Sequence, residues 1–208
     1  MRTYAIGNSA IIEDIDRICK SGLALLAFFY CDFSDYEKQD HRRLLSSLLL
    51  QFCTQSNAYF NILSDFYSAH RHGSRHASDG ELQKCLEDML KCPGQPFIYI
   101  IVDGLDECPK SFGTPSPREK VLTVVGNLVG LALPNLRICV TSRPEADIES
   151  ALRPLTPSSV SLHEETGQRQ DILVYVKSVV NSDSRMQGWR AEDKELVIEV
   201  LSRKSDGM

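Results

Sequence analysis

The chain has 208 residues, 42% of them hydrophobic and 25% charged, which fits one globular α/β core of ordinary size. Its formal net charge of -5 at pH 7 argues against a dedicated nucleic-acid binder. No apolar run approaches the length of a membrane span, and the N-terminus lacks the basic-then-apolar pattern of a secretory signal. We therefore expect a cytoplasmic protein that has neither nucleic acid nor membrane as a partner.

The first part of the chain predicts two helices on either side of one buried strand. Ser9 can cap a first helix that ends near Gly22. Residues 23–30 form a continuous apolar run, which predicts the strand. The second helix carries an apolar stripe at helical spacing, which core packing explains more simply than an interaction face. The stripe consists of Leu44, Leu45, Leu48, Leu49 and Phe52.

A polar stretch at residues 70–80 precedes the next helix. Its three histidines, His70, His72 and His76, could capture a metal, but neighbouring arginines and the absence of Cys or carboxylate partners favour a solvated loop. Ser78 and Glu81 then form a capping box, which predicts the start of a helix.

The most informative stretch is an apolar run at residues 97–102 that ends in a cluster of acids. Its length and composition predict a strand buried on both faces of a parallel sheet. Asp103 falls at the carboxyl end of that strand, where open α/β sheets bind ligands, so its carboxylate could hold Mg²⁺. Gly104 permits a sharp turn that brings Asp106 and Glu107 back to the same edge, where they could orient a water. The alternative is that these acids simply begin a solvated loop.

One more helix and one more strand follow residues 103–108, which we call the acidic loop. Residues 116–119 combine a capping box with proline at the first helical position, which predicts a helix to about Ala132. Residues 136–140 predict a short buried strand. Arg143, just past it, would share a sheet edge with Asp103 if the two strands are neighbours, and could sense a terminal phosphate. A surface arginine in a turn is the alternative.

The C-terminal part predicts a short strand at 160–162 and helices near 170–181 and 191–204. The seven cysteines are dispersed, without a C-x-x-C pair, and most lie within apolar patterns. We interpret them as reduced core residues of an intracellular protein and not as a structural zinc site. They are Cys19, Cys31, Cys53, Cys85, Cys92, Cys108 and Cys139.

The usual partner of such an acidic strand does not occur in the sequence. The phosphate loop, G-x-x-x-x-G-K-[ST], is found nowhere in the 208 residues, and Gly7-Asn8-Ser9 is too short to be a substitute cradle. That loop supplies backbone N–H donors, a helix N-terminus and a lysine to a triphosphate. We therefore expect weak or no independent ATP binding by this chain.

Three linked motifs carry a family resemblance. They are residues 28–39, with Phe-Phe-Tyr-Cys-Asp-Phe-Ser-Asp before Glu-Lys-Gln, residues 102–108, Val-Asp-Gly-Leu-Asp-Glu-Cys, and residues 133–145, with Leu-Pro-Asn-Leu and Val-Thr-Ser-Arg-Pro-Glu. In order and spacing they resemble the NACHT NTPase domain of fungal NOD-like receptor proteins, which are STAND P-loop NTPases. The resemblance runs from about residue 10 to the end, and the tail from Trp189 to Met208 resembles the helical segment after the NTPase core.

The resemblance implies a three-layer α/β architecture of the P-loop NTPase type, with a parallel sheet of the additional-strand order 5-1-4-3-2. Residues 1–182 would be a truncated nucleotide-binding core whose first strand and phosphate loop are missing or degenerate, unless Arg2–Ile6 fills the strand. Residues 183–208 would begin the following helical segment. The implied activity is that of a signal-transduction ATPase or GTPase, with Mg²⁺ and ATP or GTP as ligands, which switches between closed and oligomeric states.

The resemblance also implies roles for the acids and for the arginine. Asp103 would be the magnesium-coordinating acid of the Walker B motif, and Asp106 and Glu107 would be the hydrolytic acids. Arg143 would be the sensor that contacts nucleotide, together with Ser142.

The sequence departs from the family pattern at the N-terminus. The lysine and hydroxyl of the phosphate loop should fall near Thr3, Tyr4 and Ala5, where no Lys-Ser or Lys-Thr pair occurs. Two functions therefore stay open, and with them the question of whether the chain is an enzyme. The first is a NACHT nucleotide-binding switch of a fungal incompatibility or innate-immunity receptor, impaired in nucleotide binding. The second is a non-catalytic module that oligomerises or pairs with complete relatives.

Overall fold

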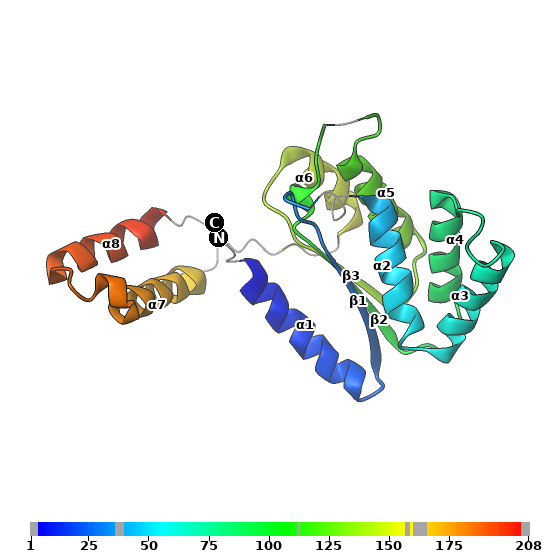
Figure 1. Cartoon of the computed structure of the whole chain (residues 1–208), viewed down its shortest axis with the longest axis horizontal. Coiled ribbons are helices and arrows are strands. Elements are labelled where there is room, and N and C mark those ends of the chain that lie inside the picture. The colour runs from blue at the N-terminus through cyan, green and yellow to red at the C-terminus, as the bar shows by residue number, and fades with distance from the viewer. Residues whose placement is uncertain (1–3, 36–39, 112, 157–158, 160–165, 205–208) are drawn as a thin grey trace. The chain divides into compact units, whose positions relative to one another are not determined.

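The fold is that of a computed structural model, which describes residues 4–35, 40–111, 113–156, 159 and 166–204. The chain separates into two compact units, residues 1–156 and 157–208. The first unit holds the parallel sheet (Figure 1). Its elements are α1 (Tyr4–Lys20), β1 (Ala24–Tyr30), α2 (His41–Cys53), α3 (Asn57–Ala69), α4 (Asp79–Leu90), β2 (Phe97–Asp103), the 3-10 turn η2 (Leu105–Glu107), α5 (Pro117–Gly130), β3 (Leu136–Val140), α6 (Ala146–Leu152) and the 3-10 turn η3 (Arg153–Leu155).

Three parallel strands form the sheet in the order β1-β2-β3, which confirms the predicted α/β class. β2 lies in the middle, and its apolar run is buried from Ile98 on, with Tyr99 half-buried, whereas Phe97 at its start is exposed. In the strand register Tyr30 is opposite Asp103, and Val102 is opposite Val140. All three strands therefore end at one edge of the sheet, which brings the segments after them together.

The observed strand order agrees with part of the expected order 5-1-4-3-2. In that numbering, β1 is strand 2, β2 is strand 3 and β3 is strand 4, so the structure contains the 4-3-2 part. Within the described ranges no strand precedes β1 and none pairs with the outer side of β3. The strand predicted at 160–162 lies outside those ranges. The full order 5-1-4-3-2 stays a prediction.

The N-terminal helix begins earlier than its capping pattern predicts. α1 starts at Tyr4, so Ser9 lies inside the helix and does not cap it. The option of a first strand at 2–6 is wrong for residues 4–6, which are helical, and the rest of that stretch is not described. Tyr4 and Ala5 stand one heptad before the isoleucine pair at 11–12, so the helical spacing of apolar residues continues upstream.

Helices cover both faces of the sheet. Figure 1 draws α1 on one side of the strands and α2 on the other, and both contact β1. The apolar stripe of α2 lies in the core, as predicted, with every member at most 2% exposed: Leu44, Leu45, Leu48, Leu49 and Phe52. Both predicted capping boxes are present, one of Ser78 with Glu81 before α4 and one of Ser116 with Glu119 before α5.

The outer edge of β1 is covered by two glutamine side chains, Gln51 of α2 and Gln55 just after that helix. Gln55 accepts a hydrogen bond from the Leu26 N–H at 2.9 Å and donates one to the Leu26 carbonyl at 2.6 Å. Gln51 makes the same pair with Phe28, at 3.0 and 2.7 Å. Because an open strand edge is a template for another chain, these amides remove β1 as a pairing site.

β3 is less buried than the sequence predicts. Its residues alternate between half-buried and exposed, since it is an edge strand of the described sheet. Cys139 is consequently exposed, so the expectation of a core position is wrong for this cysteine. Cys31, Cys85 and Cys108 are buried, and all seven cysteines are free thiols, as predicted.

His70 does not belong to a solvated loop, contrary to the sequence-based interpretation. It follows α3, is 6% exposed and packs its ring against Phe66, with ring centroids 4.2 Å apart. Its Nδ1 lies 2.7 Å from the Phe66 carbonyl and its Nε2 lies 2.7 Å from Arg75 Nη2. His72 and His76 are exposed, and the described residues contain no cluster of three or more His, Cys, Asp or Glu that could hold a metal.

The second unit is a pair of helices that contact each other, α7 (Thr166–Ser182) and α8 (Ala191–Lys204), with the 3-10 turn η4 (Ser184–Met186) between them. Both helices were predicted. The expected end of the nucleotide-binding core at residue 182 falls between α7 and η4 and stays a prediction. Among all helices of the described residues, none combines the length and the apolar character needed to cross a membrane.

Candidate functional site at the carboxyl edge of the sheet

Asp103 ends β2, and its side chain is held between the neighbouring strands. The residue is 8% exposed, and the Thr141 hydroxyl donates a hydrogen bond to its carboxylate. Its carbonyl accepts a hydrogen bond from the Cys31 N–H at 2.8 Å. Thr141, directly after β3, also accepts a hydrogen bond from the Gly104 N–H at 3.1 Å. The carboxylate is therefore fixed in position at the sheet edge.

Gly104 makes the sharp turn that the sequence predicts. Its φ is +68°, in the left-handed region that glycine adopts without steric cost. The chain then forms η2, whose first residue, Leu105, is fully buried and donates from its N–H to the Thr141 carbonyl at 3.0 Å. This anchor directs Asp106 and Glu107 back to the carboxyl edge.

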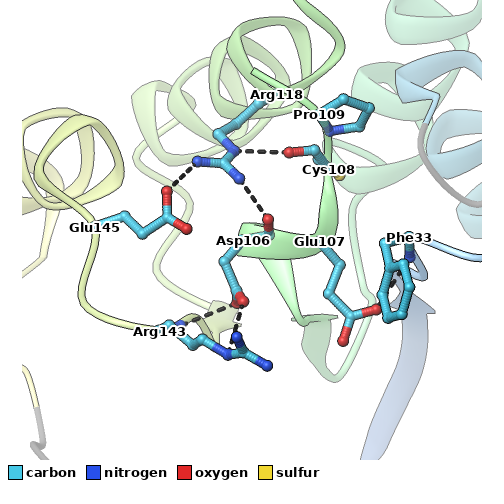
Figure 2. Close-up of a pocket in the computed structure, with 8 residues that line it drawn as sticks. All are labelled: Phe33, Asp106, Glu107, Cys108, Pro109, Arg118, Arg143 and Glu145. Carbon is cyan, nitrogen blue, oxygen red and sulfur yellow. Dashed lines mark hydrogen bonds and ion pairs between the residues drawn. The ribbon is translucent and has the colours of Figure 1, made fainter. Parts of the chain in front are cut away.

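Asp106 and Arg143 form a contact between the acidic loop and the segment after β3 (Figure 2). The backbone N–H of Arg143 donates to Asp106 Oδ1 at 3.0 Å, and Arg143 Nε lies 3.4 Å from Oδ2. The aspartate side chain is 10% exposed and that of the arginine is 59% exposed. The neighbouring Ser142 hydroxyl donates to the Arg143 carbonyl at 2.7 Å. An anion at this edge could thus reach the arginine from solvent.

Glu107 turns toward a different partner from Asp106. Its Oε2 accepts a hydrogen bond from the Phe33 N–H at 3.1 Å, in the loop after β1. In Figure 2 the two acidic side chains point apart, one to Arg143 and one to Phe33. Each acid therefore fastens the acidic loop to the end of a neighbouring strand.

A cavity of about 590 Å³ opens at this edge. Its lining includes three of the residues predicted for the site, Asp106, Glu107 and Arg143, while Asp103 and Ser142 do not line it. Acidic and basic groups alternate around the wall, so the cavity is polar and carries both signs of charge (Figure 2). The other lining residues are Phe33, Cys108, Pro109, Arg118 and Glu145.

Arg118 is a site residue that sequence reasoning missed. It is 4% exposed, and its Nε donates to the Cys108 carbonyl at 2.8 Å. A second guanidinium nitrogen donates to the Asp106 carbonyl, and Nη1 donates to Glu145 at 2.5 Å and to Asp147 at 3.2 Å. The sequence did contain a sign of this role. A cation in the first turn of a helix is opposed by the helix dipole, so Arg118 at the start of the predicted helix indicates a specific anionic partner.

Lys110 completes an ion-pair network around Arg118. Its Nζ lies 2.6 Å from a carboxylate oxygen of Glu145 and 3.0 Å from one of Asp147. Hydrogen bonds from Lys110 and then from Arg118 lower the pKa of Glu145. The network links the acidic loop, α5 and the start of α6, which fixes one wall of the cavity.

The oxygen ligands at this edge fit a partly coordinated Mg²⁺ but not a metal held by protein alone. Asp103 and the Thr141 hydroxyl are adjacent oxygen donors of the kind that Mg²⁺ prefers. No group of three or more His, Cys, Asp or Glu within the described ranges could hold a metal ion. A magnesium ion here would therefore take its other ligands from phosphates and water.

Comparison with known proteins identifies a family to which the chain is similar. The sequence profile of a family described as nephrocystin 3, N-terminal, matches residues 6–143. The matched region covers the three strands of the described sheet and ends at Arg143. Neither the curated proteins nor the solved structures contain a match to this chain.

Proposed function

Because the chain belongs to the nephrocystin 3 N-terminal family, we propose that it carries the acidic half of the nucleotide site of a NACHT-type P-loop NTPase domain that acts in signal transduction. The resemblance to fungal NOD-like receptor proteins supports this proposal over a general α/β domain. The three motifs of the resemblance coincide with the ends of the three paired strands.

One observation carries the proposal: the acids and the arginine gather at the carboxyl edge of a parallel sheet, where such sheets bind ligands. In this function Asp103 is the magnesium ligand, supported by the hydroxyl of Thr141. Asp106 and Glu107 are the hydrolytic acids, because both line the cavity. Arg143 is the group that a terminal phosphate would meet, with Ser142 beside it.

The 208-residue chain by itself should bind ATP or GTP weakly or not at all. The described edge offers acids and an arginine, but the sequence has no G-K-[ST] segment to contact the other phosphates. An acidic edge repels a triphosphate unless a metal ion lies between them. Magnesium is therefore required for whatever binding remains.

Titration of the chain with fluorescent ATP and GTP analogues, with and without Mg²⁺, tests this expectation. We expect a dissociation constant weaker than about 10 µM in every condition, which corresponds to less than about 7 kcal/mol of binding free energy. A micromolar or tighter constant would contradict the impaired binding.

The nucleotide-site proposal has a separate test in a longer form of the protein. If the transcript encodes an in-frame G-x-x-x-x-G-K-[ST] segment before the codon for Met1, the form that includes it should hydrolyse nucleotide. Asp103→Asn in that form should abolish hydrolysis while Thr141 still donates to the amide oxygen, so the fold is retained. Hydrolysis at the unchanged rate would overturn the magnesium role of Asp103.

A specific observation favours a second candidate function, a non-catalytic oligomerisation module. Among the described strands, β1 has its outer edge covered by Gln51 and Gln55, whereas β3 pairs with β2 alone. An open edge can accept a strand from another copy of the chain. This candidate is supported by the contrast between the two edges.

The oligomeric state of the chain tests this second candidate. Light scattering over a range of concentrations should show reversible self-association if β3 pairs between copies. Cys139→Lys, at an exposed position of β3, should then suppress it, because charged side chains protect strand edges. A chain that remains monomeric at every concentration would contradict this second candidate.

A further inference from the structure

Two buried thiols meet behind the acidic loop. Cys31 Sγ lies 3.2 Å from Cys108 Sγ, although the two residues are 77 positions apart in the sequence. Cys31 follows β1 and is 6% exposed, while Cys108 follows η2 and is fully buried. The contact thus joins the end of one strand to the loop that carries Asp106 and Glu107.

The two thiols differ in their electrostatic environment. A hydrogen bond with Cys31, together with the Arg118 guanidinium, lowers the pKa of the Cys108 thiol. Cys31, in contrast, has its backbone N–H bonded to the carbonyl of Asp103 at the end of β2. Cys108 therefore ionises first and is the nucleophile of the pair, with Cys31 as a protonated partner.

The pair of thiols lies next to the wall of the cavity. Cys108 belongs to its wall, together with Phe33 and Glu107, which flank the contact between the two loops. Because Cys108 is fully buried, a small molecule such as peroxide reaches its sulfur only when this wall opens locally. Larger oxidants, such as another protein, would need the loops to open.

We propose that Cys31 and Cys108 are a modification site, at which hydrogen peroxide converts two thiols into a reversible disulfide. The Cys108 thiolate attacks one peroxide oxygen, the O–O bond breaks, and the other oxygen leaves as hydroxide and takes up a proton. Cys108 is now a sulfenic acid. The Cys31 sulfur attacks the Cys108 sulfur, the S–O bond breaks, and the hydroxyl group of the sulfenic acid leaves with the Cys31 proton as a second water. Two thiols and one peroxide thus give one disulfide and two waters.

The starting geometry favours this pairing over any other among the described cysteines. A disulfide has sulfurs about 2 Å apart, so Cys31 and Cys108 need to approach by only about 1 Å. The bond would tie the segment after β1 to the acidic loop, beside the hydrogen bond from the Phe33 N–H to Glu107. Oxidation would therefore lock the loop that bears two acids of the candidate site.

Peptide mapping of the peroxide-treated chain tests the proposal. The intact protein is treated with hydrogen peroxide, its remaining thiols are alkylated in denaturant, and the digest is analysed by mass spectrometry. We expect a peptide pair linked through Cys31 and Cys108, the loss of this pair on treatment with dithiothreitol, and no alkylated form of either cysteine before that treatment. The exposed Cys139 reports that peroxide was present in sufficient dose.

Two variants resolve the order of the steps. Cys31→Ser should leave Cys108 as a sulfenic acid that dimedone traps, because the resolving thiol is gone. Cys108→Ser should abolish both the link and the trapped adduct at this site. Recovery of both thiols unmodified from the wild-type chain while Cys139 is oxidised would overturn the proposal, and so would a link from Cys108 to another cysteine. The mapping needs no nucleotide, so its failure is distinct from a failure of the proposed function.

Discussion

The Nε of Arg118 donates a hydrogen bond to the carbonyl oxygen of Cys108 at 2.8 Å, and so the first turn of α5 holds the end of the acidic loop. The same guanidinium contacts the Asp106 carbonyl and the carboxylate of Glu145. A planar guanidinium with five N–H donors can donate to all of these acceptors at once, whereas a lysine ammonium lacks this fixed planar arrangement of donors. The geometry of the acids at the sheet edge therefore depends on a residue outside the acidic motif.

Replacing this arginine should destabilise the protein strongly. Arg118→Met would leave buried carbonyl groups without a donor, at about 1–3 kcal/mol for each unsatisfied group. It would also leave Glu145 with Lys110 as its cation, which limits the cost. We expect a loss of about 2–4 kcal/mol in the free energy of unfolding, measured by urea titration with circular dichroism.

Arg153→Met is the matched control for this variant. Arg153 also pairs with a glutamate, Glu149, but its side chain is 77% exposed, so the change should stay within about 0.5 kcal/mol. The loss of stability in Arg118→Lys should fall between these two values, because lysine keeps the positive charge but lacks the planar set of guanidinium donors. Equal stabilities for Arg118→Met and Arg153→Met would show that the buried network contributes nothing.

Local sequence patterns predicted the three paired strands and the starts of α4 and α5 well, and long-range contacts less well. The apolar run of β2 and the boxes at Ser78 and Ser116 are short-range signals, and each appears where it was expected. Arg118 was missed and His70 was misread, because burial of a polar side chain depends on partners that only the fold supplies.

Two further differences have physical causes of the same kind. Cys139 was expected in the core, but β3 is an edge of the described sheet and one face of it is uncovered. Helix α3 was missed although Tyr59, Ile62, Leu63 and Phe66 have the spacing of an apolar helical face. The convergence of Asp106 and Arg143 could be expected only once the two strands were taken to be neighbours.

Loss of the Thr141 hydroxyl should weaken the attachment of Asp103 to the neighbouring strand. Thr141→Val keeps the shape but removes the donor to the carboxylate and the acceptor for the Gly104 N–H. We expect about 1–3 kcal/mol of destabilisation by urea titration.

Thr123→Val, which removes an exposed hydroxyl on α5, is the control and should change stability by less than about 0.5 kcal/mol. Equal effects of the two valine substitutions would argue against the Asp103 contact, and Thr141→Ser should retain most of the stability.

The capping box of α4 should make stability depend on pH in the acidic range. The backbone N–H of Ser78, and then Arg75, hold the pKa of Glu81 at about 2, below its ordinary value of 4.5. Its contribution is therefore complete above pH 4.5 and is lost as pH falls toward 2. Glu81→Gln should make the slope of unfolding free energy against pH shallower in that window, as urea titrations at several pH values would measure. Arg75→Met should reduce the slope partly, and an unchanged slope in Glu81→Gln would refute the assignment.

Gly104 should resist substitution more than any helical glycine of the first unit, because its backbone is left-handed and its surroundings are tight. Its φ is +68°, and an added Cβ would lie 3.4 Å from the Cys31 carbonyl oxygen. Gly104→Ala should therefore cost about 1–2 kcal/mol in the free energy of unfolding. Gly126→Ala is the opposite case, since that position is helical and the new Cβ would meet Leu155 Cδ1 at an ordinary 3.8 Å. It should stabilise the protein by about 0.5–1 kcal/mol, and a stabilising Gly104→Ala would show that the turn before the acids is not left-handed in solution.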